Sequence, residues 1–253
     1  MKITHIGGPT AVLNLGGLTF LIDPAFDEPR EYQLPGRVMK KLTGPAIPAA
    51  ELGPVDVVLV SHDQHKDNLD DAGRALLAGI PTVLSTPDAA TRISGVRGLA
   101  NWESVDLPRP DGGVITVTGV PALHGPEGAE EVLGVVTGFV LKGDGLPTVY
   151  VSGDNASLGL VKEIADRFAP IDVAVLFAGA ARTTLLDGAN LTLTSADAVE
   201  AARLLAAAVV VPVHTEGWAH FTEGPDQFAA AFAEAGLSDR VKLLEHGVAT
   251  ALD

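Results

Sequence analysis

The stretch VVLVSHDQHKDNLD, which runs from Val57 to Asp70, decides how the rest of this chain is interpreted. Its first four residues are apolar and β-branched or aliphatic, as in a buried strand. They are followed at once by a run of polar residues that contains His62 and His65. Ligands bind where strands of helix-covered sheets end, because backbone and side chains there face a crevice. The stretch therefore predicts a ligand site at the end of a buried strand.

The same placement recurs at three later strands. His124 lies just past an apolar run that ends at Val120, and two further polar residues, Asp154 and His214, follow the runs 148–151 and 209–213. Imidazole nitrogen and carboxylate oxygen are ligands that suit zinc, manganese or iron. Any one of these residues taken alone is more simply a helix cap or an ordinary polar residue. Four strand ends carrying ligand types together favour a metal site.

The candidate ligands divide into two sets. One ion would be held by His62, His65 and His124 with water as the fourth ligand, and a second by Asp67, Asp154 and His214. Asp154 is the candidate for a carboxylate that bridges the two ions. Two divalent ions, two carboxylates and a bridging hydroxide leave a charge of about +1 in the site. An anionic or carbonyl-bearing substrate is therefore acceptable there.

Composition sets the class of protein and excludes several partners. The 253 residues are 47% hydrophobic and 19% charged, which is typical of a soluble globular chain with one sizeable core or two small ones. The net charge of −15 disfavours nucleic acid and anionic membrane surfaces as partners. The longest apolar run, 204–213, is too short to span a bilayer. With no cysteine and no signal peptide pattern, we expect a cytoplasmic protein without disulfides.

Strand and helix patterns alternate along the chain, which predicts sheets covered by helices. Two hairpins are expected, at 11–22 and at 138–151, each with a glycine-containing turn. Further strands are expected at the N-terminus and at 57–60, 81–84, 114–120, 173–177, 209–213 and 241–244, and helices near 70–78, 88–93, 158–168, 196–207 and 226–235. The segment 24–54 holds six prolines and predicts a long loop or lid over an opening. Five of its residues either contact an anionic substrate or, as the favoured interpretation, belong to an ordinary solvated loop: Arg30, Tyr32, Arg37, Lys40 and Lys41.

The ordered motifs resemble the metallo-β-lactamase superfamily, whose members typically carry H-x-H-x-D-H after a buried strand, then a later His, a Gly-Asp and a final His. The matches in this chain are Ile6-Gly7, Leu21-Ile22-Asp23-Pro24, Pro121-Ala122-Leu123-His124, Ser152-Gly153-Asp154 and Pro212-Val213-His214. The closest similarity is to metal-dependent hydrolases of the ascorbate-6-phosphate lactonase-like branch. The resemblance implies one domain over 1–253, an α/β fold built as a four-layered αβ/βα sandwich, and a metal-bound hydroxide as nucleophile.

Two departures from the family pattern stand in the first motif. His62 and His65 are three residues apart instead of two, which requires a bulge or a wider turn. Asn68 stands where the family has its last histidine, so the second ion could be loosely held or absent. We expect Asn68 to hydrogen bond to ligand residues, and Asp23, which matches the family's Asp-Pro, to be a structural carboxylate. His220 is expected either to touch substrate or to lie on a surface loop.

These observations favour a hydrolase that cleaves an ester or lactone in a small molecule. The metal would lower the pKa of bound water to roughly 7, and Asp67 would orient the nucleophile or carry its proton. Zinc is the favoured ion, with manganese and iron as alternatives. One alternative function is a phosphodiesterase or nuclease of the same fold, although no basic track for nucleic acid is evident. The other is a metal-containing binding or sensor protein without turnover. The sequence does not predict the oligomeric state.

Overall fold

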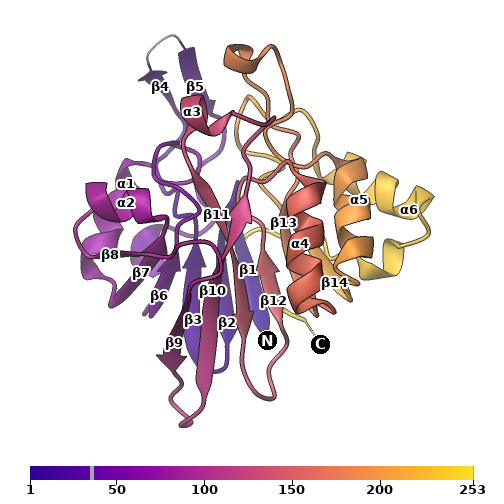
Figure 1. Ribbon diagram of the computed structural model, residues 1–253. Helices are drawn as coiled ribbons and strands as arrows, with labels where there is room; N and C mark the ends of the chain where they lie inside the picture. Colours follow the sequence, from indigo (N-terminus) through magenta and orange to yellow (C-terminus); the bar gives the residue numbers. More distant parts are fainter. Residues whose placement is uncertain (35–36, 253) are drawn as a thin grey trace.

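Two β-sheets face each other in the computed structural model, which describes residues 1–34 and 37–252 (Figure 1). The first sheet has the strand order β15-β1-β2-β3-β6-β7-β8. Its strands are β1 (Lys2–Gly7), β2 (Thr10–Leu15), β3 (Leu18–Ile22), β6 (Val57–Leu59), β7 (Thr82–Ser85), β8 (Val96–Gly98) and β15 (Thr250–Ala251). Strands β2 and β3 form the first expected hairpin. Strand β6 pairs in parallel with β3, which places the residues after Leu59 at one edge of the sheet.

The second sheet has the order β14-β13-β12-β11-β10-β9. Its strands are β9 (Ser104–Pro108), β10 (Val114–Ala122), β11 (Val136–Lys142), β12 (Val149–Val151), β13 (Val173–Phe177) and β14 (Val209–Val213). Strands β11 and β12 form the second expected hairpin, and β12, β13 and β14 run parallel. The helices α4 (Leu158–Phe168) and α5 (Ser195–Leu204) connect these parallel strands, and α6 (Pro225–Glu234) follows β14.

Three apolar clusters hold the layers together. Side chains such as Phe20, Phe139 and Phe177 are fully buried between the two sheets. The outer face of the second sheet packs against α4, α5 and α6, where Phe228 and Phe232 are fully buried. On the outer face of the first sheet lie α1 (Asp71–Leu76) and α2 (Pro87–Arg92) (Figure 1). Burying each such side chain contributes about 1.5–3 kcal/mol. The order helix, sheet, sheet, helix confirms the expected four-layered αβ/βα sandwich.

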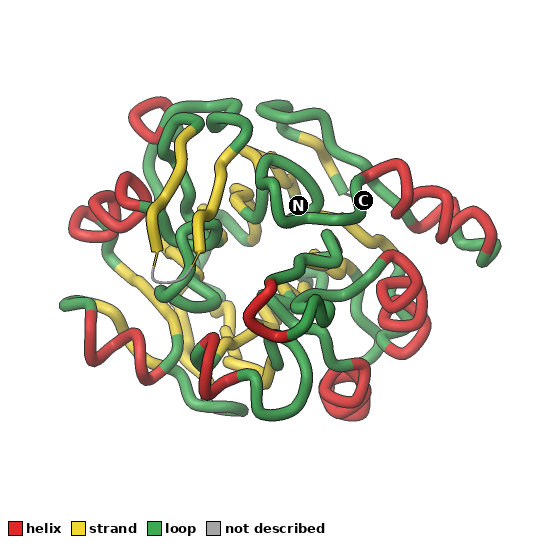
Figure 2. Tube along the Cα trace, turned by 90° about the horizontal axis from the view of Figure 1, so that it is seen from above, coloured by secondary structure: helices red, strands yellow, loops and turns green. Residues whose placement is uncertain are grey.

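The expectation of a long loop or lid over 24–54 is wrong in part, because the segment contains the hairpin β4 (Arg30–Leu34) and β5 (Arg37–Lys41). Lys41 fixes this hairpin to the body of the protein. Its buried Nζ donates to the carbonyl of Ala25 at 2.8 Å and to Asp70 Oδ2 at 3.0 Å. The hairpin stands over the edge where the strands end (Figures 1 and 2). The hairpin is held by contacts with residues distant in sequence, and no local sequence pattern predicts such contacts.

The expected strand at 241–244 is also wrong. Within the described residues, Val241 makes a single parallel bridge to Val210, and Leu243 is 48% exposed. The last strand is instead β15, which pairs with β1. Short elements that the sequence did not predict are β8, β9, the helix α3 (Glu130–Leu133) and single 3-10 turns at Ala49–Glu51, Thr184–Leu186 and Ser238–Arg240. A further 3-10 turn at Leu77–Gly79 continues the helix expected near 70–78. In the part of the chain that is described, no helix has the length and apolar character to cross a membrane.

Candidate metal centre

The polar residues that follow four strands meet at one edge of the sandwich. His62 lies just past β6, His124 past β10, Asp154 past β12 and His214 past β14. All four side chains are buried, with at most 5% of each residue exposed. Because β6 belongs to the first sheet and the other three strands to the second, the cluster lies where the two sheets open toward the same edge (Figure 1). The structure therefore brings together residues up to 152 positions apart in sequence, from 62 to 214.

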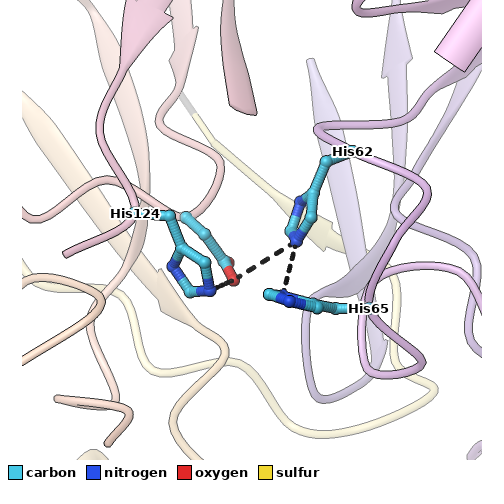
Figure 3. A group of neighbouring side chains, drawn as sticks. His62, His65 and His124 are labelled. Carbon is cyan, nitrogen blue, oxygen red and sulfur yellow. Dashed lines mark hydrogen bonds and ion pairs between the residues drawn. The ribbon is translucent and has the colours of Figure 1, made fainter. Parts of the chain in front are cut away.

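The first group consists of His62, His65, His124 and Asp154, whose donor atoms all lie within 4.8 Å of one another. His62 Nε2 is 2.9 Å from His65 Nδ1, and His124 Nε2 is 3.5 Å from Asp154 Oδ2. Figure 3 shows the three imidazole rings turned toward a common point. Ligand atoms at about 2.0–2.1 Å from a tetrahedral zinc would be roughly 3.3 Å apart. These separations are close to that value.

The extra residue in the first motif forms a wider turn after β6. Asp63 anchors this turn, since its carboxylate accepts from Arg92 Nη2 at 2.6 Å and from Arg74 Nη2 at 3.2 Å. The turn carries His65 back beside His62, so that the ring nitrogens still meet although the histidines are three residues apart. His65 presents Nδ1 to this point, whereas His62 and His124 present Nε2.

Hydrogen bonds fix the tautomers of two of these histidines. Ser61 Oγ donates to Asp23 Oδ2 at 2.6 Å and therefore accepts from His62 Nδ1 at 3.0 Å. The carbonyl of Leu191 can only accept, so His124 Nδ1 donates to it at 2.8 Å. Both rings therefore keep an unprotonated Nε2 that faces the cluster. A ring N–H held by an outer partner is the usual arrangement at histidine metal ligands.

The second group consists of Asp67, Asp154 and His214, again with donor atoms within 4.8 Å. His214 Nε2 lies 3.1 Å from Asp67 Oδ2 and 3.5 Å from Asp154 Oδ1. His220 approaches the same Asp67 Oδ2 at 3.0 Å and is 22% exposed at its side chain. His220 thus lies at the cluster and not on a remote surface loop. Asp154 belongs to both groups, which is the arrangement that a bridging carboxylate requires.

The backbone at His214 adopts a left-handed conformation with φ of 58°. Such a conformation is costly for a residue with a β-carbon and persists only where the surroundings hold it. The His214 N–H donates to the carbonyl of Gly8 at 2.8 Å, and its ring lies against Phe177 and Phe221. A β-carbon on Gly179 would lie 2.1 Å from the His214 carbonyl oxygen. Gly179 is therefore required for the close approach that places this histidine.

Asn68 lies behind the ligands and not among them. Its Nδ2 donates to Asp23 Oδ2 at 3.0 Å and to Asp154 Oδ1 at 3.1 Å, and the residue is fully buried. Asp23 also accepts the N–H and the hydroxyl of Ser61, each at 2.6 Å. Asp23, Ser61 and Asn68 together form a buried network that contacts His62 and Asp154.

The electrostatics of the cluster call for a cation. Asp23, Asp67 and Asp154 are fully or almost fully buried, and within the described residues none forms an ion pair with lysine or arginine. Burial and the nearby Asp67 and Asp23 charges raise the pKa of Asp154 well above its usual range, and burial raises the pKa of Asp23 to about 7. Asp154 Oδ2 and Asp67 Oδ1 are buried without a hydrogen-bond partner. A divalent ion would satisfy these oxygens.

The histidines are prepared to act as ligands because they are neutral. Burial lowers the pKa of His62, His124 and His214, and lowers that of His65 to about 4. A neutral imidazole keeps the lone pair that coordinates a metal. The donor set of four histidines and two aspartates therefore fits one or two divalent ions.

A pocket of about 240 Å³ opens onto the cluster. Its base contains His65, Asp67, His124 and His220, and its walls include apolar side chains of β5 and of the loops after β13 and β14. Its basic lining residues are Arg37, Lys40 and Arg182. The hairpin β4–β5 therefore borders the opening, as expected of a lid. The sequence did not single out Arg182, because no motif surrounds it in the loop after β13.

Two facing sheets with a buried histidine and aspartate cluster at one edge are the architecture of the metallo-β-lactamase fold. Residues 19–215 match the family model described as the β-lactamase superfamily domain. A UPF0173 metal-dependent hydrolase from Pelotomaculum thermopropionicum is 32% identical over 253 residues, which are 98% of each chain. The chain belongs to the β-lactamase superfamily, in the UPF0173 family of metal-dependent hydrolases.

Further comparisons agree with this membership. A UPF0173 metal-dependent hydrolase from Methanoculleus marisnigri is 33% identical over 214 residues, which cover 80% of this chain and 85% of the other. Among solved structures, an isothiocyanate hydrolase from Delia radicum gut bacteria has a TM-score of 0.83 at 22% identity and covers 99% of both chains. This structural likeness concerns the fold. The finer resemblance to lactonases of the ascorbate-6-phosphate type stays a prediction.

Proposed function

We propose that this protein hydrolyses an ester or lactone bond in a small, anionic molecule, with zinc as the preferred ion. The observation that carries the proposal is the buried cluster itself, in which unpartnered carboxylate oxygens and neutral imidazoles meet at the base of an open pocket. Manganese and iron suit the same ligand types and are the alternatives.

The two groups of ligands described above would each hold one ion. His62, His65, His124 and Asp154 would hold the first ion, and Asp67 and His214 would hold a second that shares Asp154. A bound divalent ion lowers the pKa of its water to roughly 7 and stabilises the negative charge that develops on the attacked carbonyl. Asn68 and Asp23 would orient Asp154 and His62 from behind.

In this proposal Asp67 handles the proton of the attacking water. Although burial opposes its ionisation, His220 and His214 hold the pKa of Asp67 well below its usual range, so its carboxylate stays charged. Its Oδ1 is free of hydrogen bonds, while Oδ2 accepts from both histidines. His220 lines the pocket and contacts Asp67 at 3.0 Å. It could therefore pass a proton from Asp67 toward the leaving alkoxide.

The pocket lining supports an anionic substrate. Arg37, Lys40 and Arg182 surround a site that lies in a chain of net charge −15. Lys40 is 3.4 Å from Glu31 and Arg182 Nε donates to Asn190, so both side chains keep donors for a ligand. Val38, Met39 and Leu191 add apolar surface to the lining of the same pocket. A compact acyl or lactone group with a carboxylate or phosphate fits this arrangement.

The test is a substrate panel with metal-loaded protein. Lactones, simple esters, amides and phosphodiesters are compared by kcat/KM, and Asp67→Asn is compared with the exposed control Asp166→Asn. We expect turnover of esters or lactones that Asp67→Asn lowers by about 10²–10⁴-fold and Asp166→Asn retains. Faster cleavage of phosphodiesters would favour the phosphodiesterase alternative. Ligand binding without any product would favour the sensor alternative, and either result would overturn the proposal.

The anionic specificity has its own test. Removal of one charge by Arg182→Gln should raise KM for a carboxylate-bearing ester by about 3–10-fold, which corresponds to roughly 0.7–1.4 kcal/mol. KM for a neutral ester of the same size should stay within twofold. Arg203→Gln, an exposed arginine of α5 paired with Glu200, serves as the control. Equal effects on charged and neutral esters would contradict a role in charge recognition.

A further inference from the structure

A second cluster of metal-ligating side chains lies apart from the residues assigned above. It contains His5 of β1, Glu216 in the loop after β14, and His246 in the segment before β15. These three residues come from the beginning, the later part and the end of the chain. None of them is used in the proposed hydrolysis.

The three side chains converge closely. Their donor atoms all lie within 4.8 Å of one another, and His246 Nε2 is 2.7 Å from Glu216 Oε1. The rings of His5 and His246 meet edge to face, with centroids 4.5 Å apart. The backbone keeps the segments together, since Gly247 N donates to the carbonyl of His5 at 2.8 Å.

A backbone hydrogen bond fixes the tautomer of His5. It is 3% exposed, and its Nε2 contacts the carbonyl of Gly8 at 2.9 Å. A carbonyl oxygen can only accept, so Nε2 carries the proton and Nδ1 keeps its lone pair. Burial also lowers the pKa of His5 to about 4, which keeps the ring neutral near pH 7. A buried imidazole held by a backbone carbonyl through its other nitrogen is the arrangement found at histidine metal ligands.

We propose that His5, Glu216 and His246 form a separate divalent metal site with the chemistry of a zinc centre. Two imidazoles and one carboxylate are an established zinc ligand set, with water completing the tetrahedron. The side chains of Glu216 and His246 are 40% and 36% exposed, so an ion can enter from solvent and keep a water ligand.

Such an ion would cross-link three segments that are distant in sequence. Glu216 lies between His214 and Trp218 in sequence, and Trp218 stacks on Tyr32 of the hairpin β4–β5 with ring centroids 5.7 Å apart. The site would therefore tie the loop that carries His214 and His220 to β1 and to the C-terminal segment. The expected role of this ion is to stabilise the loop. Glu216 itself takes no part in the proposed hydrolysis.

The test compares zinc stoichiometry. Metal-free full-length protein is dialysed against one fixed free Zn²⁺ concentration and assayed by elemental analysis. We expect His246→Gln and Glu216→Gln each to bind one Zn²⁺ fewer than the wild type, and the exposed control Glu234→Gln to bind the wild-type number. The rise in Tm on adding Zn²⁺ should be smaller in both site variants. Unchanged stoichiometry in both variants would overturn the proposal.

A second measurement locates the ions directly in the wild type. Anomalous diffraction at the zinc edge from wild-type crystals should give a peak among His5, Glu216 and His246, separate from the peak at His62, His65 and His124. The variant His62→Gln should lose ion at the first position and keep it at the second. A peak at the first cluster with no density at the second would show that His246 and Glu216 form an ion pair only, and would contradict the site.

Discussion

Replacement of Asn68 by alanine tests how the buried network supports the metal ligands. The side chain amide donates to Asp154 Oδ1 at 3.1 Å and to Asp23 Oδ2 at 3.0 Å. Hydrogen bonds to charged groups contribute about 1.5–3 kcal/mol each. Residues that orient metal ligands in this way change metal affinity by about 10–100-fold. We therefore expect Asn68→Ala to raise the Kd for Zn²⁺ by about 10–100-fold, or roughly 1.4–2.7 kcal/mol.

The assay is a Zn²⁺ titration of metal-free protein against a competing chelator of known affinity. Denaturant unfolding of the same samples reports stability, which we expect to fall by about 1–3 kcal/mol in the metal-free variant because two buried acceptors lose a donor. Asn101→Ala, at an exposed asparagine, is the matched control. If a folded Asn68→Ala protein binds Zn²⁺ within twofold of the wild type, the reasoning that Asn68 orients Asp154 is refuted.

Three further predictions concern single residues. Asp67→Asn should lower kcat by about 10²–10⁴-fold with an unchanged circular dichroism spectrum, and a loss below threefold would contradict its proton-handling role. Gly179→Ala should lower the free energy of unfolding by more than about 2 kcal/mol, because the new β-carbon would lie 2.1 Å from the His214 carbonyl oxygen; an unchanged denaturation midpoint would refute this. Burial raises the pKa of Asp23 to about 7, so its neutral form is favoured in the folded state. This preference stabilises metal-free protein fully below about pH 4. The stabilisation, roughly 4 kcal/mol, is lost as the pH rises through 7. The neutral buried histidines change the free energy of unfolding with pH in the opposite direction. The measurement is therefore the difference in the free energy of unfolding between wild type and Asp23→Asn, from urea unfolding between pH 4 and 8. A difference that stays constant over this range would contradict the prediction.

Elements with a strong local pattern were predictable from the sequence. β13 and β14 are continuous apolar runs, and both have the expected bounds. Helix α4 also has its expected bounds, because Ser157 caps it and its Oγ accepts from Leu160 N at 3.2 Å. The hairpin β4–β5 was not predictable, since Lys41 and Trp218 hold it through contacts with distant segments.

The candidate site also has a part that the sequence predicts and a part that it does not. The ligand types and their places at strand ends are local properties, so the meeting of His62, His124 and His214 at one edge follows from the topology. The 3.0 Å contact of His220 with Asp67 depends on the path of the loop after β14, which no periodicity describes. Arg182 reaches the pocket lining from the loop after β13 for the same reason. The second histidine and glutamate cluster depends on where β1 and the C-terminal segment lie in the fold.

The central claim is that His62, His65, His124, Asp154, Asp67 and His214 bind metal together. Its most direct test is anomalous diffraction from crystals of the protein purified without chelators and supplied with Zn²⁺, combined with elemental analysis of the same preparation. We expect one or two anomalous peaks within about 2.0–2.3 Å of these nitrogen and oxygen atoms, with Asp154 in contact with each. Metal-replete protein with no anomalous density in this cluster would contradict it.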